Sequence, residues 1–111
     1  METFLKDLFA TQEYEESNFF LIAGPCVIES KEVLDTVASR VSAICKNLGI
    51  PYVFKASYRK ANRTSATSFT GLGDDLGLSL LKNTGNAFSL PTTTAIHAAH
   101  EAAMADPYAD I

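Results

Sequence analysis

The chain has 111 residues, the length of at most one small domain. Its nine basic and thirteen acidic residues give a formal net charge of −4, which excludes a dominant basic surface for nucleic acid. The two cysteines imply no disulfide framework, and the apolar run over residues 19–23 is far too short to cross a bilayer. We therefore expect a cytoplasmic protein that binds neither nucleic acid nor membrane.

The first half of the sequence predicts one strand followed by one helix. Residues 1–18 are polar and acid-rich and are expected to form a leader or a short outer element. The continuous apolar run over 19–23 predicts a strand buried on both faces. Ser30 is a favourable N-cap, and apolar residues at helical spacing predict a helix over 31–48 that ends at Gly49.

The second half of the sequence continues the alternation of strands and helices. We predict a strand over 51–56, a polar loop over 62–73, a helix over 74–88, a β-branched strand over 91–97, an alanine-rich helix over 98–105 and the opening of a fourth strand over 108–111. This alternation predicts right-handed βαβ units and a parallel sheet. Such α/β sheets belong to doubly wound folds or to (β/α)8 barrels, whose chemistry gathers at the carboxyl ends of the strands.

Chemically capable groups follow all three predicted strands. Cys26 follows the first strand, the cluster over residues 55–65 follows the second, and His97 ends the third. The 55–65 cluster combines lysine, arginine, hydroxyl and amide side chains, which suit phosphate and carboxylate oxygens. A solvated basic loop is the alternative interpretation, and the apolar strand that leads directly into the cluster favours a binding site.

Several motifs, occurring in order, resemble 3-deoxy-D-manno-octulosonate 8-phosphate synthase over about residues 19–111. They are Ala-Gly-Pro-Cys-Val-Ile-Glu-Ser at 23–30, Pro-Tyr-Val-Phe-Lys-Ala-Ser at 51–57, Lys-Ala-Asn-Arg-Thr-Ser at 60–65, and Ser-Phe at 68–69 before Gly-Leu-Gly at 71–73. The resemblance implies the N-terminal part of an aldolase-type (β/α)8 TIM barrel, about its first three βα units. It also implies a homo-oligomeric transferase that condenses phosphoenolpyruvate with D-arabinose 5-phosphate, giving 3-deoxy-D-manno-octulosonate 8-phosphate and phosphate for lipopolysaccharide biosynthesis.

The resemblance assigns a role to each candidate residue. Lys55, Ser57 and Lys60 would hold phosphoenolpyruvate; Asn62, Arg63, Thr64 and Ser65 would hold the sugar phosphate; the catalytic candidates are His97 and Lys60, which would also reach the aldehyde oxygen. In the family's reaction the nucleophilic carbon of phosphoenolpyruvate attacks the aldehyde, water adds to the carbon bearing the phosphate, and phosphate leaves. The task of the protein is therefore positioning and electrostatic stabilisation.

The two cysteines are expected to differ in role. Cys45 lies on the apolar face of the predicted helix and is expected to be a core residue. By spacing alone, a cysteine such as Cys26 is more often an inert small hydrophobe. In the resemblance, however, Cys26 stands where the family's metal-dependent branch has cysteine and its metal-independent branch has asparagine. A divalent transition metal is therefore implied, with its remaining ligands expected on later strands absent from this chain.

Departures from the family pattern leave other interpretations open. Arg59 stands where the family usually has an acid, Thr70 replaces an arginine, and Ala95 and Ala98 replace an aspartate and a glutamate that flank His97. We expect an N-terminal fragment, a truncated product or a decayed copy, which is inactive alone and self-associates through open sheet edges. One alternative is a 3-deoxy-heptulosonate 7-phosphate synthase-type enzyme, and another is a non-catalytic truncated half-barrel.

Overall fold

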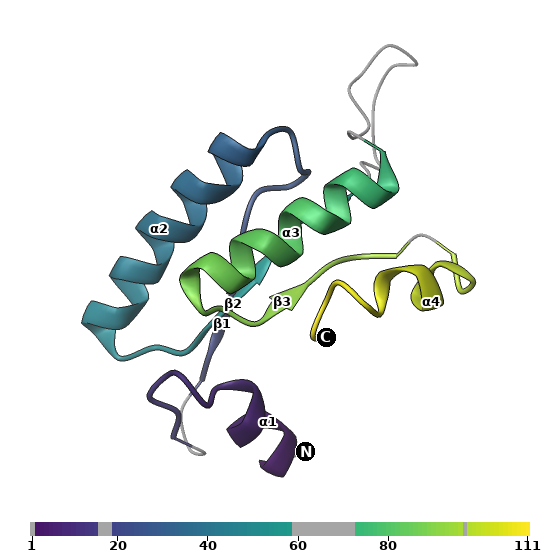
Figure 1. Cartoon of the computed structure of the whole chain (residues 1–111). Helices are drawn as coiled ribbons and strands as arrows, with labels where there is room; N and C mark the ends of the chain where they lie inside the picture. Colours follow the sequence, from purple (N-terminus) through teal and green to yellow (C-terminus); the bar gives the residue numbers. More distant parts are fainter. Residues whose placement is uncertain (1, 16–18, 59–72, 97) are drawn as a thin grey trace.

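The computed structural model describes residues 2–15, 19–58, 73–96 and 98–111. Helices and strands alternate along the described chain after a short first helix (Figure 1). The elements are α1 (Glu2–Leu8), β1 (Leu21–Ala23), α2 (Lys31–Leu48), β2 (Tyr52–Lys55), α3 (Asp74–Phe88), β3 (Thr92–Thr93) and α4 (Glu101–Ala105). Within these described residues, no helix is both long enough and apolar enough to span a membrane.

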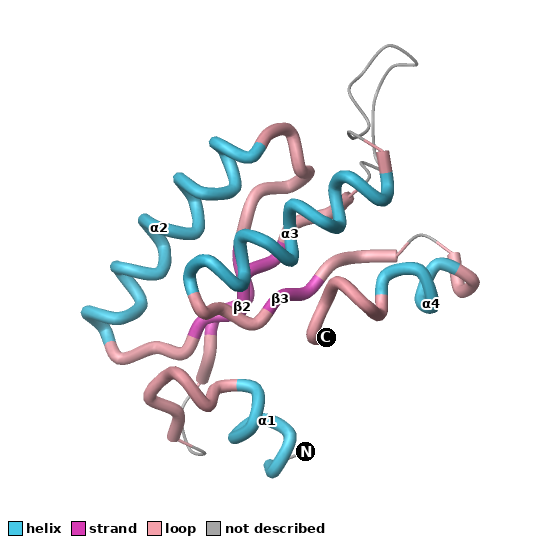
Figure 2. The backbone as a smooth tube through the Cα atoms, in the orientation of Figure 1, coloured by secondary structure: helices cyan, strands magenta, loops and turns pink. Residues whose placement is uncertain are grey.

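The three strands form one parallel sheet in the order β1-β2-β3. Figure 2 draws these strands in magenta. Ala23 pairs with Phe54 across β1 and β2, and Lys55 pairs with Thr93 across β2 and β3. Each strand is connected to the next by a helix, so the chain makes two successive βαβ crossovers. This arrangement confirms the predicted α/β class and parallel sheet.

Helix α2 has the bounds that the sequence predicts, because the residues that cap its two ends are adjacent to it in the sequence. The Ser30 hydroxyl oxygen accepts a hydrogen bond from the amide of Val33 at 3.2 Å, which satisfies a free amide of the first turn. Gly49 closes the helix with a φ of 68°, a left-handed conformation that glycine adopts without steric cost. Helix α3 also matches its prediction, although it ends at Ser89, a non-glycine residue with a φ of 55°.

The core lies between the sheet and the layer formed by α2 and α3, which lie side by side on one face (Figure 1). Alternate residues of the β2 segment enter this core, and its largest fully buried side chains include Tyr52 and Phe54. Leu34 of α2 and Leu78 of α3 pack against them from the helical side. Cys45 is 3% exposed in the same cluster, which confirms the prediction that it is a core residue.

The first strand differs from its prediction in length and in burial. β1 begins at Leu21, and Phe19, which was expected to lie inside a buried strand, is 65% exposed. Ile22 is 46% exposed, so the expectation of burial on both faces is wrong. The physical reason is the position of β1 at an outer edge of the described sheet, where a partner strand lies on one side only.

The third strand is limited to two residues, because its partner β2 ends at Lys55. Helix α4 begins at Glu101 instead of residue 98, since a turn precedes it. The predicted fourth strand does not form: residues 108–111 run beside β3 as turn and coil. There the amide of Asp110 donates to Thr92 O at 2.8 Å, and Asp110 Oδ2 accepts from the amide of Thr92 at 2.9 Å.

The region before residue 19 contributes a short outer element at the amino ends of the strands. Phe9 is 1% exposed, and its ring lies 5.5 Å from that of Tyr14 and 5.1 Å from that of Phe20. Gln12 Nε2 donates to Tyr52 O at 2.9 Å, and Gln12 Oε1 accepts from the Tyr52 amide at 2.8 Å. One side-chain amide thus satisfies both backbone groups at the start of β2.

The ends of β1 and β2 approach so closely that only glycine fits between them. A methyl carbon built on Gly24 would lie 1.6 Å from the carbonyl oxygen of Lys55 and 2.7 Å from its carbonyl carbon. Both atoms belong to the backbone, so no side-chain rotation could relieve the overlap. The two strands can therefore stay in register beyond their last paired residues only with glycine at position 24.

We predict that Gly24→Ala destabilises the chain by about 1–3 kcal/mol, because the added methyl group must force the two strand ends apart. Urea unfolding at a fixed chain concentration measures this change. Gly49→Ala is the comparison, since its methyl group meets nothing within 4 Å and introduces only the strain of a left-handed residue. A Gly24→Ala chain no less stable than the Gly49→Ala chain would contradict the packing argument.

Candidate functional site

The carboxyl ends of β1 and β2 lie side by side and bring two candidate residues into one region. Cys26 follows Gly24, whose backbone lies against that of Lys55. Further along, the amide of Ile28 donates to the carbonyl oxygen of Ser57 at 2.9 Å. The segment that carries Cys26 therefore runs along the segment that carries Lys55 and Ser57.

The end of β3 reaches the same region from the other side of β2. The amide of Ala56 donates to Thr93 O at 3.4 Å, and the Thr94 hydroxyl donates to Ala56 O at 2.9 Å. Ala95, where the sequence departs from the family pattern, follows Thr94 and is half-buried. Three strand ends thus converge, as parallel strands in one sheet require.

Alternation along the β2 segment directs its polar side chains away from the core. Ala56 and Tyr58 are fully buried on the helical side, whereas Lys55 is exposed and Ser57 is half-buried. An ammonium group and a hydroxyl group consequently share the face of the sheet opposite the helices. This pair can donate charge-assisted hydrogen bonds to an anion from one charged and one neutral donor.

Six predicted site residues lie outside the described residues. They are Lys60, Asn62, Arg63, Thr64, Ser65 and His97. Arg59 and Thr70, two of the departures from the family pattern, also lie outside them. The structure thus places Cys26, Lys55 and Ser57 among the predicted site residues, and brings these three together.

The described residues supply one exposed thiol to the candidate site and no complete metal site. Cys26 is exposed, and no group of three or more histidine, cysteine, aspartate or glutamate side chains in the described part of the chain could hold a metal ion. A closed transition-metal site typically has four ligands. Cys45 is no substitute, because it is buried and burial raises the pKa of its thiol, which disfavours the metal-binding thiolate.

A buried polar pair next to this region was missed in the sequence. The Tyr58 hydroxyl donates a hydrogen bond to Glu101 Oε1, and the two residues are 0% and 4% exposed. Tyr58 belongs to the predicted cluster, but Glu101 stands alone among alanines in the short helix α4. A single acidic residue in an alanine-rich segment was the only available signal, and it did not indicate a partner 43 positions away.

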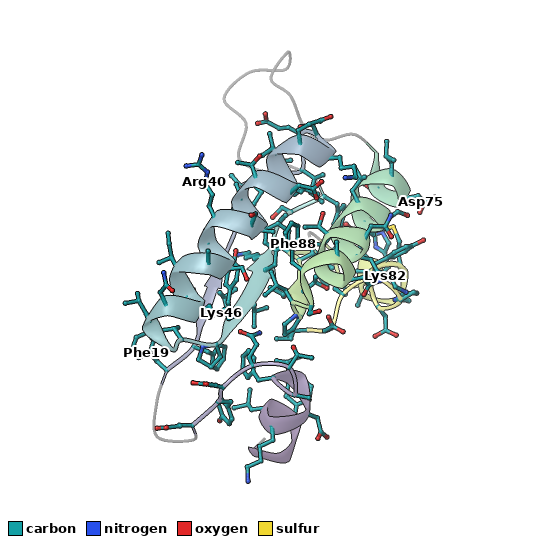
Figure 3. The ribbon with its side chains drawn as sticks, turned by 60° about the vertical axis from the view of Figure 1, so that its left-hand side comes forward. Phe19, Arg40, Lys46, Asp75, Lys82 and Phe88 are labelled. Atoms are coloured by element: carbon teal, nitrogen blue, oxygen red, sulfur yellow. The ribbon has the colours of Figure 1, made fainter. Side chains whose placement is uncertain are left out.

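A pocket lies at the opposite end of the strands, between the carboxyl ends of α2 and α3. Its volume is about 480 Å³, and its lining includes Gln12, Lys46 and Phe88; Figure 3 labels the last two on their helices. The carbonyl groups at helix carboxyl ends carry a partial negative charge, and the lining holds the carboxylate of Glu13 together with the ammonium group of Lys46. These charges do not single out this pocket as an anion site.

Comparison with known proteins agrees with the motifs at these strand ends. The model of the DAHP synthetase I family matches residues 11–111. The chain is 49% identical over 83 residues to a 2-dehydro-3-deoxyphosphooctonate aldolase of Paraburkholderia xenovorans, covering 75% of this chain and 29% of the relative. It is 44% identical over 96 residues to the enzyme of that name from Fusobacterium nucleatum, covering 86% of this chain and 34% of the relative.

A third relative with the same name, from Burkholderia mallei, is 43% identical over 93 residues, which covers 84% of this chain and 33% of the relative. The chain thus spans about a third of the length of the curated relatives it matches. The family match, in contrast, covers nearly all of the chain and includes all three strand ends. The chain therefore belongs to the DAHP synthetase I family.

Proposed function

We propose that this chain carries the phosphoenolpyruvate-binding part of an aldol-type synthase that condenses phosphoenolpyruvate with D-arabinose 5-phosphate. The observation that carries the proposal is the convergence of Cys26, Lys55 and Ser57 at adjacent carboxyl ends of parallel strands. The name shared by the relatives, 2-dehydro-3-deoxyphosphooctonate aldolase, supports this choice of reaction. In this proposal the sheet is the first part of a (β/α)8 barrel.

The proposed ligand contacts follow from charge and from position in the chain. Lys55 and Ser57 offer an ammonium group and a hydroxyl group on one face of the sheet, and both would bind phosphoenolpyruvate oxygens. Lys60 would add a second positive charge, and residues 62–65 would bind the sugar phosphate. In this arrangement the protein holds the enol carbon against the aldehyde carbon while phosphate leaves.

We further propose that Cys26 is one ligand of a divalent transition metal. An exposed thiol beside the candidate site suits such an ion. The described residues hold no group of three or more candidate ligands and so do not fit a complete site, and we assign the metal no step in the reaction. Self-association is proposed for the β1 side of the chain, where Phe19 and Ile22 expose apolar surface.

Two alternatives are supported by particular observations. The matching family is described by the name DAHP synthetase, which supports a 3-deoxy-heptulosonate 7-phosphate synthase-type reaction with a shorter sugar phosphate. The second alternative is a non-catalytic half-barrel that associates through its open edge, which the exposed apolar side chains of Phe19 and Ile22 at β1 support. For both synthase-type reactions we propose that the 111-residue chain alone is inactive, and an assay of phosphate release from phosphoenolpyruvate tests this.

We predict that Lys55→Gln weakens phosphoenolpyruvate binding by the 111-residue chain. Loss of a hydrogen bond to a charged group typically amounts to about 1.5–3 kcal/mol, or roughly 10- to 150-fold in the dissociation constant. Isothermal titration with phosphoenolpyruvate measures the change. Lys46→Gln is the matched control, because Lys46 is an exposed lysine at the opposite end of the strands. Equal losses in the two variants would indicate non-specific charge attraction and remove support for the site.

We predict that Ala95→Asp improves use of the sugar substrate in a chimera that joins residues 11–111 to the remainder of the Fusobacterium nucleatum relative. A carboxylate at this strand end can accept hydrogen bonds from sugar hydroxyls, and such contacts amount to about 1–3 kcal/mol. The apparent Michaelis constant for D-arabinose 5-phosphate should fall roughly 5- to 150-fold, with that for phosphoenolpyruvate nearly unchanged.

The control for this chimera is Ala99→Asp, which adds the same charge at an exposed position. Effects of equal size on both substrates, or an equal effect of Ala99→Asp, would contradict the role of position 95. The same chimera separates the two enzymatic alternatives. Faster turnover with erythrose 4-phosphate than with D-arabinose 5-phosphate would favour the heptulosonate-type reaction.

We predict that Co²⁺ added to the chain produces a thiolate-to-cobalt absorption band that Cys26→Ser abolishes and Cys45→Ser preserves. The exposed Cys26 thiol can reach the ion, whereas the Cys45 thiol is buried with a raised pKa. Because one thiolate without partners binds weakly, dialysis should remove the cobalt. A band that survives Cys26→Ser and disappears in Cys45→Ser would refute the assignment.

A further inference from the structure

A buried side-chain hydrogen bond joins the candidate site to helix α4. The Tyr58 hydroxyl donates to Glu101 Oε1, and both residues are almost fully buried. Tyr58 follows Ser57 directly, and Glu101 is the first residue of α4. The bond therefore ties the end of the β2 segment to the helix that follows β3.

The Tyr58 backbone is also held from two other elements. A methyl carbon built on Gly77 would lie 3.3 Å from Tyr58 Cβ, so helix α3 packs closely on this residue. The preceding carbonyl group, that of Ser57, accepts from the amide of Ile28 at 2.9 Å. The loop after β1, helix α3 and helix α4 thus converge on two consecutive residues of the β2 segment.

Packing alone does not explain a carboxyl group at position 101. A leucine or methionine could fill a buried position in an alanine-rich helix without removing a polar group from water. A buried carboxyl group is tolerated when it is hydrogen-bonded, so the fold must bring a hydrogen-bond donor to it. Tyr58, three residues after Lys55, supplies such a donor.

We propose that Tyr58 and Glu101 are positioning residues, which fix the end of the β2 segment so that Lys55 and Ser57 present their donors to the anionic ligand. Neither residue is assigned a contact with the ligand. The inference rests on the proposed function for the identity of that ligand. The hydroxyl-to-carboxyl bond acts by penalising conformations in which the segment separates from α4, because either polar group would then be left buried without this partner.

Tyr58→Phe in the 111-residue chain removes the donor and retains the ring. Hydrogen exchange is the first measurement: the Ile28 amide, which bonds to Ser57, should exchange roughly three- to tenfold faster. The Ile50 amide, which bonds to Cys45 at the opposite end of the strands, should be unchanged. In titrations with phosphoenolpyruvate, the dissociation constant should rise by a similar roughly three- to tenfold factor.

Variants of Glu101 separate the hydrogen bond from general stability. Glu101→Gln keeps an acceptor oxygen for the Tyr58 hydroxyl and should lose less than Glu101→Leu in both measurements. Glu101→Leu should show at least the effects of Tyr58→Phe. The double variant Tyr58→Phe/Glu101→Leu should lose less than the sum of the two single variants, since both remove the same bond.

Thr84→Val is the control. It removes another buried hydroxyl group, which donates to Asp35 Oδ1 at 3.4 Å between α3 and α2, and should lower thermal stability without changing phosphoenolpyruvate affinity. Unchanged Ile28 exchange in Tyr58→Phe, or an equal loss of affinity in Thr84→Val, would overturn the positioning role. If the wild-type chain does not bind phosphoenolpyruvate, the proposed function fails, whereas the dependence of Ile28 exchange on Tyr58 and Glu101 still decides this inference.

Discussion

The backbone contact between Gly24 and Lys55 is the constraint on which the arrangement of the candidate site depends. No side chain separates the two strand ends at this point, so the loop after β1 must follow the end of β2. The same closeness allows the Ile28 amide to reach the Ser57 carbonyl group two positions beyond Lys55. Phe54, adjacent to the contact, faces the opposite way and anchors the strand in the core beneath α2 and α3. One glycine therefore links the packing of the core to the position of the polar groups.

The two ends of the sheet have different physical tasks. At the amino end, aromatic packing around Phe9 and the paired hydrogen bonds of Gln12 satisfy and cover the start of β2. Burial in this part of the core also raises the pKa of Tyr52, whose hydroxyl is bonded to the carbonyl group of Ala23. At the carboxyl end, Lys55 remains exposed, and the stabilising contacts lie behind it on the helical side. The residues that stabilise the sheet are therefore different from the exposed residue proposed to bind the ligand.

Helix α2 could be predicted to the residue because its end signals, Ser30 and Gly49, act locally. Strand lengths could not, because a strand extends only as far as a partner strand continues beside it. Phe19 has strong β propensity but precedes the first paired residue, and so it lies exposed. The closeness of Cys26 and Lys55 could be predicted, because the carboxyl ends of neighbouring parallel strands meet at one edge of the sheet. The bond between Tyr58 and Glu101 could not be predicted, because the periodicity of a sequence does not indicate a single contact between distant residues.

The carboxylate of Asp110 has a consequence for how copies of this chain could add to one another. Asp110 Oδ2 accepts from the backbone amide and from the hydroxyl group of Thr92, and the Asp110 amide donates back to Thr92 O. These bonds occupy the outer backbone positions of β3, where an incoming strand would have to pair. Continuous fibre growth by strand addition requires an accessible edge on both sides of every copy. If copies add through β1 as proposed above, the occupied Thr92 positions on the β3 side would limit edge-to-edge addition to a pair.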